Sequence, residues 1–150
     1  MKFSIRNRFS IYNGTIWLAF LAGLASCGPN VATQCYKVQE TLTQQPSFIQ
    51  LNKAEMVQYA HDQIGLAEQL MQLKIADLPL AEHRDQLVKL YRQDAQLRLT
   101  ETEFMEPDGS VLLTSASVRE RYDQISQQRI ANSREAQTKA SAIRLYCATQ

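Results

Sequence analysis

The sequence predicts an all-α protein, an antiparallel, up-down-up-down four-helix bundle. Beyond residue 27 the chain has only three glycines, and 45% of the whole sequence is hydrophobic with a net charge of +1, which is typical of a folded, helix-rich domain. Prolines at positions 46, 79 and 107 cut this region into four helical candidates, because proline inside a helix removes a hydrogen bond. Short connections between long amphipathic helices favour antiparallel neighbours.

The first two helical candidates lie on either side of Pro46. The first runs from about residue 32 to 45 and is short and rich in threonine and glutamine. The second follows Asn52, and Glu55 three residues later completes a capping-box pattern for a helix that extends to about Ala76. Its apolar residues recur at three- and four-residue spacing: Val57, Ala60, Ile64, Ala67, Met71 and Leu78, flanked by Tyr59, Leu66, Leu70 and Leu73.

The third candidate covers about residues 80–105, and the fourth begins at Ser115 or Ser117 and reaches about Cys147. Between them, residues 106–110 have turn composition, and residues 111–113 are expected to cap one end of the bundle. The expected core-facing residues of the third helix are Leu87, Val88, Leu90, Tyr91, Ala95, Leu97 and Leu99. Those of the fourth are Val118, Tyr122, Ile125, Ala136, Ala140, Ile143 and Tyr146, with a thinly apolar middle.

The amino-terminal 26 residues have the features of an export signal. They contain three basic residues and no acidic one, and their apolar run over residues 16–24 is too short for a stop-transfer helix, which needs about 20 residues. The four residues Leu24-Ala25-Ser26-Cys27, which begin at the last residue of this run, resemble the lipobox of bacterial lipoprotein signal peptides. A cleaved secretory protein and an uncleaved signal anchor are the alternatives.

The lipobox resemblance implies that Cys27 carries diacylglycerol and becomes the first residue after cleavage. The expected organisation is then a removed signal peptide over residues 1–26, a lipidated tether over 27–31 and a helical domain over 32–150. Two or three acyl chains form a durable membrane anchor. Because Gly28 follows the cysteine, the aspartate signal for retention in the enterobacterial inner membrane is missing, and the identity of the membrane stays open.

Three cysteines are an odd number for an exported chain, and lipidation of Cys27 leaves two. We therefore expect a disulfide between Cys35 and Cys147, with two unpaired thiols as the alternative. In an up-down-up-down bundle these residues belong to the same end, provided that the connector between Pro46 and Asn52 is extended.

Helix-turn midpoints near residues 49, 78 and 111 place Lys37, His61, Asp94 and Arg129 at one height in mid-bundle. This arrangement predicts a polar layer with an ion pair between Asp94 and Arg129; a ligand-binding pocket and simple solvent exposure are the alternatives. We expect no metal, because His61 and His83 lie at different heights and zinc sites need three or four converging ligands. We found no phosphate loop or nucleophile motif, so neither a cofactor nor enzymatic activity is expected.

Charge and composition narrow the expected partners. Removal of residues 1–26 leaves 13 basic and 15 acidic side chains, which argues against a nucleic-acid partner. Residues 117–147 carry a balance of +3 and residues 52–108 about -5, so one face could suit an acidic protein or anionic lipid, unless these are ordinary solvated helix faces.

The sequence thus favours a lipid-anchored, extracytoplasmic bundle on a periplasmic or lumenal membrane face, acting as a non-catalytic binding or scaffold factor for a membrane-surface protein. A small-ligand-binding protein and a structural envelope tether are the alternatives. In architecture alone the predicted bundle is similar to small four-helix lipoproteins of cyanobacterial photosynthetic complexes, although no motif of those families is matched.

Overall fold

A computed structural model describes residues 30–46 and 52–150 of the chain, and over these residues the protein is all-α, as predicted. The predicted signal peptide, Cys27 and the connector over residues 47–51 lie outside the described residues. The elements are α1 (Val31–Thr43), α2 (Lys53–Gln72), α3 (Leu78–Glu101), the short 3-10 helix η1 (Thr102–Phe104) and α4 (Ala116–Ala148).

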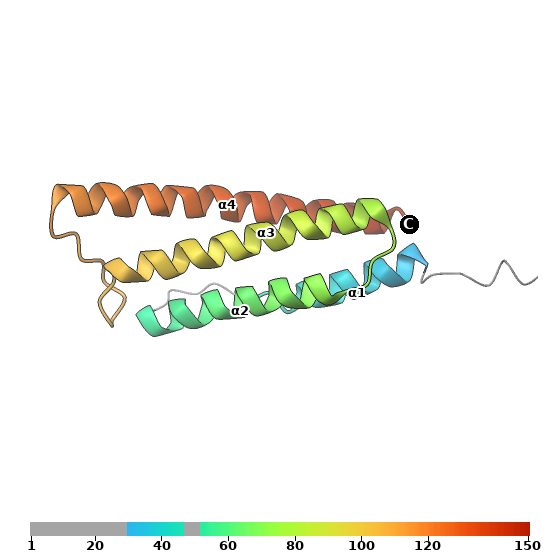
Figure 1. The fold of residues 1–150 in the computed structure, drawn as a ribbon, viewed down its shortest axis with the longest axis horizontal. Coiled ribbons are helices and arrows are strands. Elements are labelled where there is room, and N and C mark those ends of the chain that lie inside the picture. The colour runs from blue at the N-terminus through green and yellow to red at the C-terminus, as the bar shows by residue number, and fades with distance from the viewer. Residues whose placement is uncertain (1–29, 47–51) are drawn as a thin grey trace, which may run out of the picture.

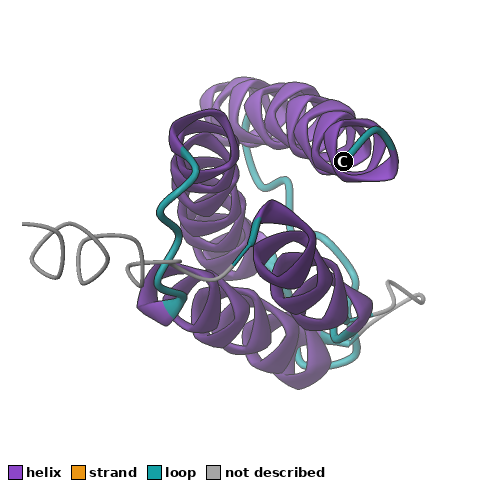
Figure 2. Cartoon of the chain, turned by 90° about the vertical axis from the view of Figure 1, so that its right-hand side faces the viewer, coloured by secondary structure: helices purple, strands orange, loops and turns teal. Residues whose placement is uncertain are grey.

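The four helices alternate in direction and surround a common core (Figures 1 and 2). Helix α3 packs against both α2 and α4, and α1 closes the opposite side between α2 and α4. We call the end at which α1 and α3 begin and α2 and α4 finish the disulfide end. Helix α1 has 13 residues and α4 has 33, so α1 covers only the part of the bundle next to the disulfide end.

Each of the four α-helices begins with a polar side chain that accepts a backbone N–H of the first turn. The predicted capping box of α2 is confirmed, because Asn52 accepts from the Glu55 amide and the Glu55 carboxylate accepts from the Asn52 amide. At α4 the cap is Ser115, which accepts from the Val118 amide, so Ser115 and not Ser117 marks the start. These local signals are why the sequence located the helix starts well.

The predicted junction between α2 and α3 was wrong by several residues. Helix α2 ends at Gln72, not at Ala76, and α3 begins at Leu78 with Asp77 as its N-cap. Pro79 lies in the first turn of α3, where its missing N–H has no helical partner to lose. The proline therefore starts this helix instead of separating two helices.

The other end of α3 was also predicted too long, because the α-helix stops at Glu101 and η1 follows. The expected turn after it is confirmed: the Glu106 amide donates to the Ser110 carbonyl, and Gly109 has a φ of 92°, which favours glycine. Residues 105 and 111 pair as an isolated bridge, so this segment is a small hairpin at the end opposite the disulfide end. We call that end the hairpin end.

The buried face of α2 differs from the predicted series. Met71 is 45% exposed and Leu78, at the start of α3, is 81% exposed. Val57 and Ile64 are only half-buried. Five residues of the predicted series and its flanks are buried as expected, together with Met56 and Gln63: Tyr59, Ala60, Leu66, Ala67 and Leu70. The apolar residues of α2 cover a broad arc, so periodicity alone could not decide which edge of that arc faces α3.

Cys35 and Cys147 form a disulfide, as predicted, with their Cα atoms 5.4 Å apart. Cys35 is buried against the main apolar cluster, which contains Val38 and Leu42 of α1, Leu66 and Leu70 of α2, Leu87 and Tyr91 of α3, and Ala140 and Ile143 of α4. The bridge thus joins the first helix to the last one beside the core.

We predict that removing this bridge destabilises the bundle strongly. It closes a loop with a sequence separation of 112 residues, and a loop of that length restricts the unfolded chain by roughly 4 to 5 kcal/mol. A Cys35→Ser/Cys147→Ser variant should therefore unfold at a markedly lower denaturant midpoint, and reductant should shift the native protein to the same value. Equal midpoints for native protein and variant would contradict this account.

Candidate functional site

The middle of the bundle contains a buried cluster of charged side chains, mostly from one face of α3. Asp94, Arg98 and Glu101 follow at helical spacing and are 1%, 4% and 2% exposed. The Nε atom of Arg98 donates to Oδ2 of Asp94 at 2.7 Å, so the two residues form an ion pair within α3. Such a pair is stable in a core only when both charges keep their partners.

Helix α2 completes the surroundings of Arg98. The guanidinium carbon lies 4.5 Å from the ring centroid of Tyr59, close enough for a cation–π contact, and Nη1 is 3.8 Å from the Met56 sulfur. Burial raises the pKa of Tyr59, and the nearby Arg98 charge partly opposes this rise. The tyrosine therefore stays neutral beneath the arginine at physiological pH.

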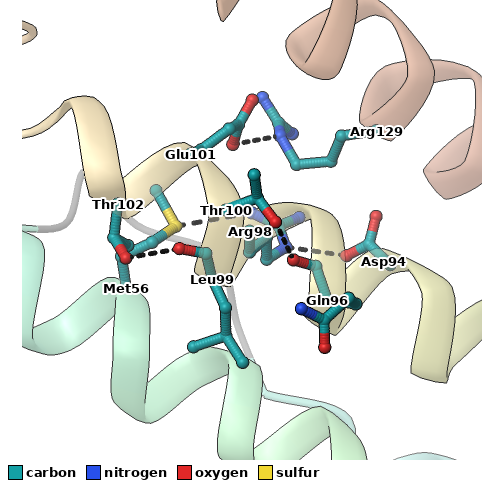
Figure 3. Close-up of polar contacts among 9 residues, drawn as sticks. All are labelled: Met56, Asp94, Gln96, Arg98, Leu99, Thr100, Glu101, Thr102 and Arg129. Atoms are coloured by element: carbon teal, nitrogen blue, oxygen red, sulfur yellow. Dashed lines mark hydrogen bonds and ion pairs between the residues drawn. The ribbon is translucent and has the colours of Figure 1, made fainter.

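Helix α4 contributes Arg129, which pairs with Glu101 (Figure 3). The Arg129 Nε atom lies 2.6 Å from Glu101 Oε2, although it is not aligned for a hydrogen bond. In the same region, the side-chain amide of Asn132 donates to the Leu90 carbonyl at 2.8 Å. These contacts fix the position of α4 along α3 where the apolar contacts of α4 are few.

The predicted polar layer is therefore built differently. Asp94 and Arg129 are both in the cluster but do not pair with each other, and His61 and Lys37 are exposed. Heights estimated along the bundle axis could not show that Asp94 lies closer to Arg98, and Arg129 closer to Glu101, than Asp94 and Arg129 lie to each other. The spacing of Asp94 and Arg98, four residues apart on one helix, was the available signal for this pair.

A cavity of about 320 Å³ adjoins the cluster. It is lined by Gln45, Pro46, Tyr59, Gln63, Tyr91, Asp94, Arg98, Arg129, Ser133, Ala136 and Gln137. The volume lies at the lower end of the range for small-molecule sites, roughly 300 to 1,000 Å³, and the lining is unusually polar for such a site. Gln45 and Pro46 show that the cavity borders the carboxyl end of α1.

Two buried acceptors that line the cavity have no partner in the structure, Oδ1 of Asp94 and Oε1 of Gln63. Their residues are 1% and 3% exposed, so bulk solvent cannot satisfy them directly. A buried acceptor without a partner costs about 1 to 3 kcal/mol, which ordered water or a hydrogen-bond donor of a ligand would offset. The cavity is thus suited to polar guests that donate hydrogen bonds.

Tyr91 also lines the cavity, and its hydroxyl donates to Gln45 Oε1 at 3.3 Å. Burial, as the main cause, raises the pKa of Tyr91 to about 12. This hydrogen bond connects α3 to the segment that follows α1.

A second group of polar contacts lies at the disulfide end. The Gln34 side-chain oxygen accepts from the backbone amides of Ala76 and Asp77 at 2.6 and 3.1 Å. The Tyr146 hydroxyl donates to Asp77 at 2.8 Å, and Arg84 Nη1 donates to the Leu73 carbonyl at 2.7 Å. These bonds join all four helices around the disulfide.

Neither region resembles a metal or membrane-spanning site. Within residues 30–46 and 52–150, no three histidine, cysteine, aspartate or glutamate side chains lie together as a metal site, and no helix is long and apolar enough to cross a membrane.

In comparisons with protein-family models, curated proteins and solved structures, the chain matches none of them.

We predict that Asp94→Ala lowers the free energy of unfolding by about 3 to 5 kcal/mol, because it removes the carboxylate that pairs with the buried Arg98 charge. Chemical denaturation measures this change. Asp85, in the Arg84–Asp85 pair, supplies a matched control, since its side chain is 55% exposed. The change in Asp85→Ala should stay below about 1 kcal/mol. An unchanged midpoint in Asp94→Ala would exclude an important buried pair.

We also predict an alkaline loss of stability that depends on Tyr91. In the folded protein Tyr91 retains a proton that the unfolded chain releases near pH 10.0. The resulting contribution to the free energy of unfolding is complete below pH 10.0 and declines as the pH rises toward about 12. Unfolding free energies measured across this window should fall more steeply in the native protein than in Tyr91→Phe. Identical slopes would show that Tyr91 is not the group responsible.

Proposed function

We propose that this chain is a lipid-anchored, extracytoplasmic bundle that binds a protein partner at the membrane surface and has no catalytic role. The observation that carries the binding role is the incomplete burial of α4. Of its 33 residues only Ala136, Ala140 and Ile143 are buried, and all three lie in its carboxyl-terminal half. The other half contacts η1 through Tyr122 and α3 through Arg129, and its residues are exposed or only half-buried.

The exposed part of α4 presents an apolar residue among charged side chains of both signs. Arg119, Arg121 and Arg134 are exposed, and so are Glu120, Asp123 and Glu135. Ile130, which lies between residues 119–123 and 134–135 along the helix, is 41% exposed. Arg121 lies 5.9 Å from the Phe104 ring centroid, and Phe104 contacts Tyr122 edge-on with centroids 5.8 Å apart. Arg134 lies one helical turn from Ile130, and an arginine beside an exposed apolar residue is a common composition for a protein-binding surface.

The location is supported by the cysteines. Disulfides persist in oxidising compartments, and the Cys35–Cys147 bridge accounts for two of the three cysteines in the sequence. The third, Cys27, ends the lipobox-like segment, so lipidation would account for it as well. We propose a periplasmic or lumenal membrane face on this basis.

A second candidate function is binding of a small polar ligand in the mid-bundle cavity. The two unpartnered acceptors, Asp94 Oδ1 and Gln63 Oε1, favour this role, because a ligand with hydroxyl, amide or amino groups would satisfy them. Under this alternative, the thermal midpoint should rise with ligand concentration, and Asp94→Ala should abolish the rise.

Photo-cross-linking in native membranes tests the proposed function. A photoreactive residue in place of Ile130 should capture one dominant protein neighbour, whereas the same residue in place of Met71 should not. Met71 is a matched control because it is 45% exposed, close to the 41% of Ile130, but lies on α2. Absence of a dominant neighbour at Ile130 would contradict the partner-binding role.

The intact mass of the membrane-extracted protein tests the anchor separately. We expect a chain that begins at Cys27 with added acyl mass, and two alkylated cysteines only after reduction. A chain without acyl mass would contradict lipid anchoring, whatever the cross-linking result.

A further inference from the structure

We propose that the disulfide end of the bundle rests directly on the lipid bilayer, and that Tyr36, Leu78 and Leu145 enter its interfacial region. This inference depends on the proposed lipidation of Cys27, and it adds an orientation and a lipid-contact surface to that anchor. The lipid bilayer then binds the folded domain directly, in addition to holding the acyl chains.

The first observation is where the most exposed apolar side chains lie. Among the large hydrophobic residues of the described chain, the three highest exposed fractions are 81% for Leu78, 70% for Leu145 and 65% for Tyr36. Single exposed apolar residues are normal on a protein surface. Here, however, all three most exposed ones belong to the disulfide end.

Direct contacts show that these residues share that end. Tyr36 follows Cys35 and Leu145 precedes Cys147 by two positions, and the disulfide holds those two Cα atoms 5.4 Å apart. Leu78 follows Asp77, which accepts a 2.8 Å hydrogen bond from Tyr146, the neighbour of Leu145. Two crosslinks therefore hold α1, α3 and α4 together where the exposed residues lie.

The chain length places the anchor beside the same end. Cys27 precedes Asn30 by three residues, and an extended chain covers at most about 3.6 Å per residue, so Asn30 lies within about 11 Å of the lipidated position. Tyr36 and Leu145 lie within about 8 Å of the ends of their helices, at 1.5 Å rise per residue. Interfacial helices bury their apolar faces by about 5 to 10 Å, so these heights match the depth of the interface.

The charged residues of this end are compatible with lipid headgroups. Lys37, Lys74 and Arg144 are exposed there. Glu68 on the last turns of α2 and Glu82 on the first turns of α3 are exposed acids, and the exposed Asp85 pairs with Arg84. Long cationic side chains keep their charges among headgroups while their stems lie against apolar groups. Because these acids offset most of the positive charge, the apolar side chains should contribute most of the contact. Tyrosine, with an apolar ring and a polar hydroxyl, is well suited to this boundary.

Tryptophan reporters test the orientation. The single tryptophan of the sequence is Trp17, within the predicted signal peptide, so the mature lipidated protein should have no background signal. Leu78→Trp and Leu145→Trp place a reporter at the disulfide end. Leu112→Trp is the matched control, because Leu112 is 47% exposed but belongs to the hairpin end.

Each acylated variant is reconstituted into protein-free vesicles of phosphatidylcholine and phosphatidylglycerol. We expect blue-shifted emission and quenching by brominated lipid for Leu78→Trp and Leu145→Trp, and neither for Leu112→Trp. Circular dichroism checks that each variant is folded. If Leu78→Trp or Leu145→Trp is not folded, Tyr36→Trp is used in its place.

The outcomes separate this inference from the proposed function. Acylated protein whose two disulfide-end reporters behave like Leu112→Trp would overturn the membrane contact and leave the anchor intact. A blue shift seen in native membranes but not in vesicles would overturn it in favour of a protein that covers this end. Protein without acyl mass would overturn both the anchor and the contact.

Discussion

The disulfide between Cys35 and Cys147 is the constraint on which the arrangement of the bundle depends. Helix α1 has 13 residues, a length at which an isolated helix is only marginally stable in water. The bridge holds it against α4, and the hydrogen bonds of Gln34 to the loop between α2 and α3 fix its start. Val38 and Leu42 can then complete the apolar core, so the position of α1 depends on its contacts with α4.

The short length of α1 also explains why the bundle changes character along its axis. Near the disulfide end, four helices bury a contiguous apolar core. Where α1 ends, the interior becomes polar: a cavity borders Gln45, and Asp94, Arg98, Glu101 and Arg129 supply the contacts between helices. Buried charges of this kind add little net stability but restrict how helices can align. The position of α4 along α3 therefore depends on polar contacts in this part of the molecule.

Both proposals depend on this difference between the two ends of the bundle. The disulfide end combines the crosslinks, the most exposed apolar residues and the start of α1, which follows the proposed lipidation position in the sequence. The exposed half of α4 extends toward the hairpin end, on the far side of the molecule from the proposed membrane contact. A protein anchored in this way would hold the exposed half of α4 away from the lipid, where the part of a membrane-bound partner that extends above the bilayer could reach it. The cavity lies between these two regions and is compatible with either candidate function.

The sequence by itself determined the helical class, the capping box at Asn52 and the cysteine pairing, because these depend on local spacing or on chemistry that one residue type carries. It narrowed the start of α4 to Ser115 or Ser117, and the structure selects Ser115. It predicted most of the buried face of α2 but not its edges, since the apolar arc of this helix is broad and only packing decides that Met56 and Gln63 are buried and Met71 is exposed. It placed Asp94 and Arg129 in mid-bundle but not their partners, Arg98 and Glu101. Ion pairs depend on distances of a few ångströms and on the rotation of each helix about its axis. Only the tertiary structure sets those quantities, because they result from the packing of all four helices together.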